Sequence, residues 1–158
     1  EFERGGSTGS NAAQQVGLHR VKNLAKLTPK EGGSLLDDAS FQRKLNETEI
    51  QLESIQYTEF RLMAALAKGE SPGPESSVLK TLSADIQQQL TELSVEAIAE
   101  FAAAHQPEAR TVGADTVSIG HDDGKMAFTQ YFNLRASSIA GGTNEVQKNI
   151  IAKMVLGL

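Results

Sequence analysis

The sequence predicts an all-α fold, an antiparallel up-and-down bundle of four to five helices that forms a single domain over residues 1–158. Apolar residues recur every three or four positions through most of the chain, which is the period of a helix with one buried face. Short segments rich in proline and glycine separate these stretches and mark the turns of the bundle. A chain of 158 residues is long enough to bury one substantial core.

The first half of the chain predicts two helices joined by a loop. The first helix spans residues 11–27, with apolar positions at Val16, Leu18, Val21, Leu24 and Leu27. Proline and paired glycines make residues 28–33 a loop. Asp38 can cap a long second helix that reaches about residue 68, and its buried stripe should consist of Leu45, Leu52, Ile55, Leu62 and Leu66. Thr48 and Glu59 fall on the same seam. They could be active-site groups, but long helices more often carry such residues at subunit contacts or at the ends of a bundle.

Residues 69–74, GESPGP, form the clearest interior boundary, because they can end one helix and start the next. The third helix should reach about residue 104, with core positions at Leu79, Leu82, Ile86, Leu90, Leu93, Ile98 and Phe101. Two long helices joined by so short a turn should be antiparallel. Residues 106–124 are polar and rich in glycine, and 116–119 is at most a short extended piece. A fourth helix should cover roughly residues 125–138.

The chain ends on a glycine pair followed by an amphipathic helix. Gly141 and Gly142 allow backbone angles that other residues resist, and Thr143 is a good N-cap. Glu145 lies in the first turn, where a carboxylate favours the positive end of the helix dipole. Such a turn can bind an anion or can simply be a capped helix start. The apolar stripe of this helix should face a core, and it consists of Val146, Ile150, Ile151, Met154, Val155 and Leu158.

Composition excludes several classes of protein. The net charge of −5 argues against a nucleic-acid partner or an anionic membrane surface. Without cysteine there are no disulfides or thiolate metal sites. No apolar run is long enough to span a bilayer and no signal-peptide pattern opens the chain, so we expect a soluble, cytoplasmic domain. Because the chain begins without methionine, we also expect a fragment or a processed product.

Other chemistry finds little support in the sequence. The three histidines, His19, His105 and His121, have no metal-ligand spacing with one another, and we assign no metal. The residues around His121 are most simply a solvated loop, although its two following carboxylates could bind a cation weakly. Neither a Ser/His/Asp arrangement with a glycine elbow nor a phosphate-loop pattern is present.

The last thirty residues resemble a known family. The segment 139–151, IAGGTNEVQKNII, together with the ending VLGL, is similar to the C-terminal signature of acyl-CoA dehydrogenases. Residues 131–136, YFNLRA, resemble the bacterial branch that acts on unusual acyl chains. The resemblance implies a C-terminal helical bundle without the family's N-terminal helical and middle β-domains. Such a fragment should be inactive alone and should bind FAD poorly.

The resemblance also implies an activity. In the family, a carboxylate removes the proton α to the thioester carbonyl of an acyl-CoA while FAD takes a hydride from the β-carbon, giving the trans-2-enoyl-CoA. Electrons usually pass to an electron-transfer flavoprotein. A bundle of this kind should self-associate as a homo-oligomer, a dimer or a tetramer, or join a hetero-oligomeric dehydrogenase.

The family places its catalytic base at one of two positions. One is a glutamate directly before the second glycine of the C-terminal motif, and here that residue is Gly141, which cannot act as a base. The other is a glutamate in a Glu-Arg pair entering the first helix of the bundle, and here that pair is Glu3-Arg4. The resemblance therefore implies that Glu3 is the base and that Arg4 lies near the CoA phosphates. The alternative is that Glu3 is an ordinary exposed residue near a chain end.

The resemblance assigns roles to the C-terminal turn as well. It places Thr143, Glu145 and Gly141 at the FAD and Gly142 at the acyl-CoA, and it puts Lys153 where relatives can carry an arginine close to CoA.

The sequence departs from the family at two FAD-binding motifs, Arg-x-Thr-Phe and Gly-Gly-x-Gly. Their places are taken by residues 38–43 and 106–120. Three alternatives therefore stay open: a noncatalytic subunit of a hetero-oligomeric dehydrogenase, a helical interaction module without chemistry, and a flavin oxidase on the same scaffold.

Overall fold

The predicted all-α class is confirmed in a computed structural model, which describes residues 10–157. The structure has five α-helices in its described part, with the bounds α1 Ser10–Leu27, α2 Ala39–Ala67, α3 Glu75–Ile98, α4 Ala127–Asn133 and α5 Asn144–Leu156. Short 3₁₀ helices lie between them at Leu35–Asp37, Ala99–Ala103, Glu108–Arg110, Asp122–Gly124 and Leu134–Ser138. The predicted boundary at residues 69–74 separates α2 from α3, as expected.

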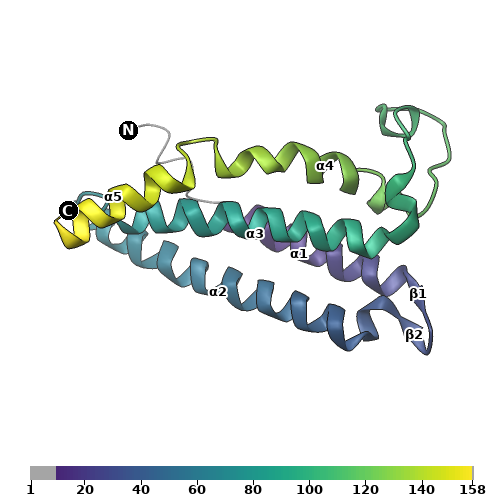
Figure 1. Ribbon diagram of the computed structural model, residues 1–158, viewed down its shortest axis with the longest axis horizontal. Coiled ribbons are helices and arrows are strands. Elements are labelled where there is room, and N and C mark those ends of the chain that lie inside the picture. The colour runs from purple at the N-terminus through teal and green to yellow at the C-terminus, as the bar shows by residue number, and fades with distance from the viewer. Residues whose placement is uncertain (1–9, 158) are drawn as a thin grey trace.

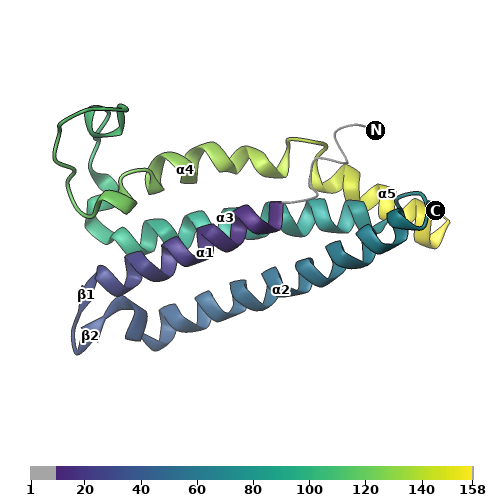
Figure 2. The same cartoon turned by 180° about the vertical axis from the view of Figure 1, so that it is seen from behind.

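The helices form an elongated bundle around α3, which contacts all four of the others (Figure 1). The chain passes along the bundle in α1, returns in α2, passes again in α3 and returns in α4. Seen from behind, α1 lies against α3, and its N-terminal end is directed toward the side of the molecule that carries α5 (Figure 2). The α4 helix covers α3 on the side opposite to α2.

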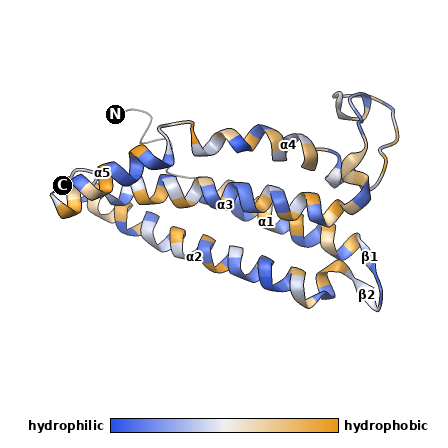
Figure 3. Cartoon of the chain, viewed as in Figure 1, coloured by the Kyte–Doolittle hydropathy of each residue, from blue (hydrophilic) through white to orange (hydrophobic). Residues whose placement is uncertain are grey.

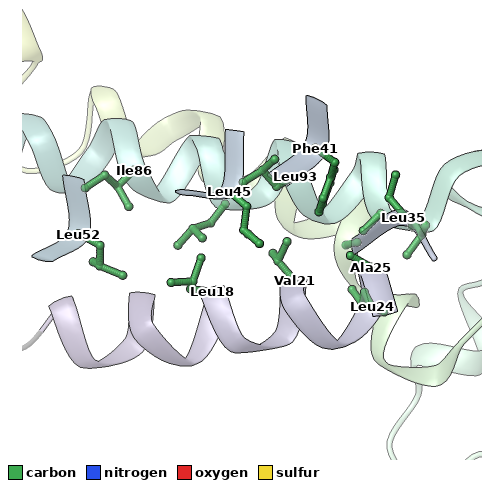
Figure 4. Packing of buried hydrophobic residues seen from close by; sticks show 14 of the residues in the cluster. Leu18, Val21, Leu24, Ala25, Leu35, Phe41, Leu45, Leu52, Ile86 and Leu93 are labelled. Atoms are coloured by element: carbon green, nitrogen blue, oxygen red, sulfur yellow. The ribbon is translucent and has the colours of Figure 1, made fainter. Parts of the chain in front are cut away.

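The core lies where α1, α2 and α3 meet. Leu18 and Val21 of α1 face Leu45 and Leu93 from the two neighbouring helices (Figure 4), and all four are at most 4% exposed. The predicted stripes of the first three helices are confirmed at most positions; the exceptions, at helix ends or flanks, are Val16, Leu27, Leu66, Leu82 and Phe101.

The two polar residues on the α2 seam are buried, as predicted. Thr48 is 3% exposed, and its hydroxyl donates to the carbonyl of Lys44 at 2.9 Å. Glu59 is 6% exposed.

Two boundaries differ from the sequence predictions. The loop at 28–33 contains a small antiparallel hairpin, β1 (Pro29–Lys30) and β2 (Gly33–Ser34). The third helix ends at Ile98 rather than near residue 104, because Ala99 takes a positive φ of 49° that an α-helix cannot continue. Phe101 follows this break and is half exposed instead of buried.

The prediction that the apolar stripe of the last helix faces a core is wrong for α5. Val146, Met154 and Val155 are 49%, 55% and 60% exposed, and Gln147 is the buried residue of the helix. The reason is position: α5 packs mainly on α3 at the end of the bundle, so much of its apolar side stays exposed. Hydrophobic colour at the end of α5 marks this surface in Figure 3.

Helix length and polarity bear on membrane insertion. Within residues 10–157, no helix is both long and apolar enough to cross a bilayer.

Candidate functional site

The glycine turn that leads into α5 has the geometry that the sequence predicts. Gly141 and Gly142 have φ values of +69° and +93°, in the region that glycine tolerates and other residues resist. Thr143 is the N-cap of α5, and its Oγ1 accepts a hydrogen bond from the Val146 N–H at 3.3 Å. The chain therefore turns sharply at the two glycines and enters the helix through a side-chain cap.

Glu145 lies in the first turn of α5 and folds back onto the helix start. Its pKa is lowered first by a hydrogen bond from its own backbone N–H and next by one from the Thr143 side chain, with weaker help from Lys148 and Lys80. A negative charge at this place is also favoured by the helix dipole. Glu145 is thus held as an exposed carboxylate beside the turn.

The two glycines face different surroundings. Apart from its chain neighbours, no heavy atom of the described structure lies within 4 Å of the place where a Cβ on Gly141 would be. A Cβ on Gly142 would lie 2.7 Å from Nε2 of Gln147. On the side where a Cβ would point, the turn is therefore open at Gly141, whereas Gln147 occupies that side at Gly142. An open glycine lets a ligand approach the main chain closely.

Arg135 joins the segment before the turn to α3, a role that the sequence analysis did not foresee. Its guanidinium donates to the carboxylate of Glu92 at 2.7 Å and to the Gln88 carbonyl and Thr91 Oγ1 at 2.9 Å each. It also lies 4.5 Å from the centre of the Tyr131 ring. These contacts fix the end of α4 and the following 3₁₀ helix onto α3.

The structure brings together some of the predicted site residues. Gly141, Gly142, Thr143 and Glu145 are consecutive or nearly so at the start of α5. Lys153 is exposed on the same helix, ten residues beyond Thr143 and so about 15 Å along its axis. The predicted base, Glu3, and its neighbour Arg4 lie outside the described residues.

A cleft of about 410 Å³ lies between α1, α3 and α4. Its walls include Gly17, Leu90 and Gln130, and none of the predicted site residues that the structure describes lines it. Gln14 is also in the wall and is 5% exposed. Its Nε2 donates to the carbonyl and hydroxyl of Ser83 at 2.7 and 2.9 Å, while its Oε1 is buried without a hydrogen-bond partner among the described residues. Over residues 10–157 there is no cluster of three or more acidic or histidine side chains able to hold a metal ion.

Comparison with known proteins identifies the family. The sequence profile of the acyl-CoA dehydrogenase C-terminal domain matches residues 2–156, and the chain therefore belongs to this family. It is 31% identical over 160 residues to the acyl-CoA dehydrogenase IpdE1 of Mycobacterium tuberculosis, covering 99% of this chain and 36% of that protein. The chain thus spans about a third of the length of this relative.

Solved structures share the fold. A chain of the ChsE4–ChsE5 complex from Mycobacterium tuberculosis aligns with a TM-score of 0.66 and 25% identity, covering 94% of this chain and 35% of that one. The structure of PigA with FAD and proline aligns with a TM-score of 0.75 and 18% identity, covering 99% of this chain and 36% of that one.

Proposed function

We propose that the chain is the C-terminal domain of an FAD-dependent acyl-CoA dehydrogenase that converts an acyl-CoA to its trans-2-enoyl-CoA. Membership of the family supports the reaction type. The observation that carries the proposal is the turn at residues 141–143, which is open at Gly141 and capped at Thr143. The domain supplies contacts to the cofactor and the substrate, and the rest of the active site belongs to the other domains of the family.

The reaction requires a carboxylate above the α-carbon of the thioester. A carboxylate in a dry pocket has a raised pKa, which makes it a better base near neutral pH. When bound, FAD supplies the acceptor for the β-hydride. Gly141 occupies one position of the family's base and has no side chain, so Glu3 is the base in this proposal.

The remaining site residues bind the cofactor and the substrate and orient them. Thr143 and Glu145 contact the FAD through the start of α5, and the peptide groups of Gly141 face the flavin. Gly142 lines the acyl-CoA site. Arg4 and Lys153 supply positive charge for the CoA phosphates, for which cationic side chains are the natural partners.

Glu3→Gln in the full-length protein tests the base. We expect turnover of acyl-CoA to fall at least about a hundredfold, the usual contribution of a general base, while FAD binding stays intact. The matched control is Glu31→Gln, which removes an exposed carboxylate from the hairpin loop and should leave turnover unchanged. Retained turnover in Glu3→Gln with bound FAD would show that Glu3 is not the base.

A noncatalytic subunit is the second candidate, and the missing side chain at residue 141 favours it. Titration of the full-length protein with FAD and acyl-CoA thioesters separates the two: no bleaching of flavin absorbance by any thioester supports the noncatalytic subunit. Oxygen consumption without an electron-transfer flavoprotein would instead indicate an oxidase.

The proposal includes assembly with another chain. Exposed apolar residues on the outer face of α2, among them Ile50, Tyr57 and Phe60, add to those of α5. Exposed apolar surface of this kind usually marks contacts between proteins. Analytical ultracentrifugation should show a homodimer or homotetramer, or a monomer that assembles only with a second kind of subunit.

A further inference from the structure

Two side chains of α3 hold the residues on either side of the glycine pair. Nζ of Lys80 donates to Oδ1 of Asn144 at 3.1 Å, just after the pair, and to the carbonyl of Ser138 at 3.5 Å, just before it. Nδ2 of Asn144 in turn donates to Oδ1 of Asp85 at 3.2 Å. Residues 138–144 are therefore attached to α3 at both ends.

Gln147 holds the middle of the turn. It is 4% exposed, and its Nε2 donates to the carbonyl of Gly141 at 3.1 Å. A buried amide costs free energy unless it is hydrogen-bonded, so a buried glutamine on a helix whose apolar residues are exposed needs a reason. The contact with Gly141 supplies that reason.

The surroundings of Lys80 agree with a position between two helices. Burial lowers the pKa of Lys80, and the nearby carboxylates of Asp85 and Glu145 act in the opposite direction. The ammonium group is thus partly buried between α3 and the start of α5.

We propose that Lys80 and Gln147 are positioning residues, which fix the peptide groups of Gly141, Gly142 and Thr143 in one orientation toward the flavin and thioester. This inference rests on the proposed function of the turn. Two adjacent glycines have more conformational freedom than any other pair, so an untethered turn would take many orientations. Groups that contact a reacting ligand act best when their geometry is set before binding.

Hydrogen exchange tests the positioning directly. In the full-length protein, Lys80→Met and Gln147→Met should each speed exchange of the backbone amides of residues 140–146 by roughly tenfold, the effect of losing one well-made hydrogen bond. The control is Lys44→Met, which removes a lysine contact elsewhere in the bundle, 2.9 Å to the Glu96 carboxylate, between α2 and the C-terminal part of α3. It should leave exchange in residues 140–146 unchanged.

Conservative variants separate positioning from packing. Lys80→Arg keeps a cationic donor and should restore slow exchange, whereas Gln147→Glu keeps the shape but replaces the donor by an acceptor and should not. Unchanged exchange in Lys80→Met and Gln147→Met would overturn the positioning role.

Ligand binding tests the link to the site. Lys80→Met and Gln147→Met should weaken FAD retention or raise KM for the acyl-CoA by roughly tenfold, and Lys80→Arg should reverse the effect. Faster exchange with unchanged FAD and thioester affinity would overturn the link to the ligands. If the unmodified protein neither binds FAD nor responds to acyl-CoA, the proposed function fails, and the exchange measurement still decides whether the two residues position the turn.

Discussion

Replacing each of the two glycines of the turn by alanine should lower the stability of the domain by different amounts. In Gly141→Ala the new methyl group enters open space, so the only cost is the strain of a positive φ, which lowers the free energy of unfolding by about 1–2 kcal/mol. Gly142→Ala bears the same backbone cost and also displaces the Gln147 amide, whose hydrogen bond to Gly141 contributes about 1 kcal/mol. Urea unfolding should therefore show a larger loss of stability for Gly142→Ala. An equal loss in the two variants would mean that Gln147 does not close the turn.

The sequence predicted this turn because its conformation depends on neighbouring residues alone. Paired glycines, a capping threonine and a glutamate are sufficient to indicate a positive-φ turn at a helix start. The contacts of Lys80 and Gln147 that hold the turn were not predicted, for the opposite reason. Lys80 is 64 residues from Asn144, and no local pattern connects a lysine on one helix to a turn so distant in the sequence.

At the scale of the elements, Arg135 should decide how firmly α4 is attached. Arg135→Met removes three hydrogen bonds to α3 and should lower the free energy of unfolding by about 1–3 kcal/mol, because hydrogen bonds to a charged group are stronger than neutral ones. Thermal unfolding followed by circular dichroism measures the change. Arg43→Met, at an exposed position of α2, is the control and should stay within about 0.5 kcal/mol. Equal stability of the two variants would contradict the role of Arg135.

The long helices α1, α2 and α3 were predictable because each carries an apolar stripe, and α1 and α2 also end at segments that contain proline and glycine. The break at Ala99 was not, since the surrounding residues favour a helix and contain no glycine or proline. The burial of α5 was wrongly predicted because an apolar stripe shows which face avoids water, not which element covers it. In this chain that face stays exposed on the end of the bundle.

At the scale of the whole molecule, the proposed base and the glycine turn at residues 141–143 come from opposite ends of the sequence. Glu3 precedes α1, and residue 141 precedes α5. If both positions can present a carboxylate to the same α-carbon, a glutamate placed at residue 141 should replace Glu3. The described surroundings of Gly141 allow this, because no heavy atom other than those of its chain neighbours lies within 4 Å of a Cβ there. The positive φ adds a strain of about 1–2 kcal/mol, which a folded domain can tolerate.

The double variant Glu3→Gln/Gly141→Glu in the FAD-loaded full-length protein tests whether a glutamate at residue 141 can replace Glu3 as the base. We expect its turnover to be at least about tenfold higher than that of Glu3→Gln. A positioned base contributes about 10²–10⁴-fold, and the gain should be at the low end because the new glutamate lies on a strained backbone. Bleaching of flavin absorbance by an acyl-CoA thioester measures the rate. Glu3→Gln/Gly141→Gln is the matched control, because it adds the same volume without a base. Equal recovery in the control would show that filling the space, and not proton abstraction from residue 141, restores the reaction.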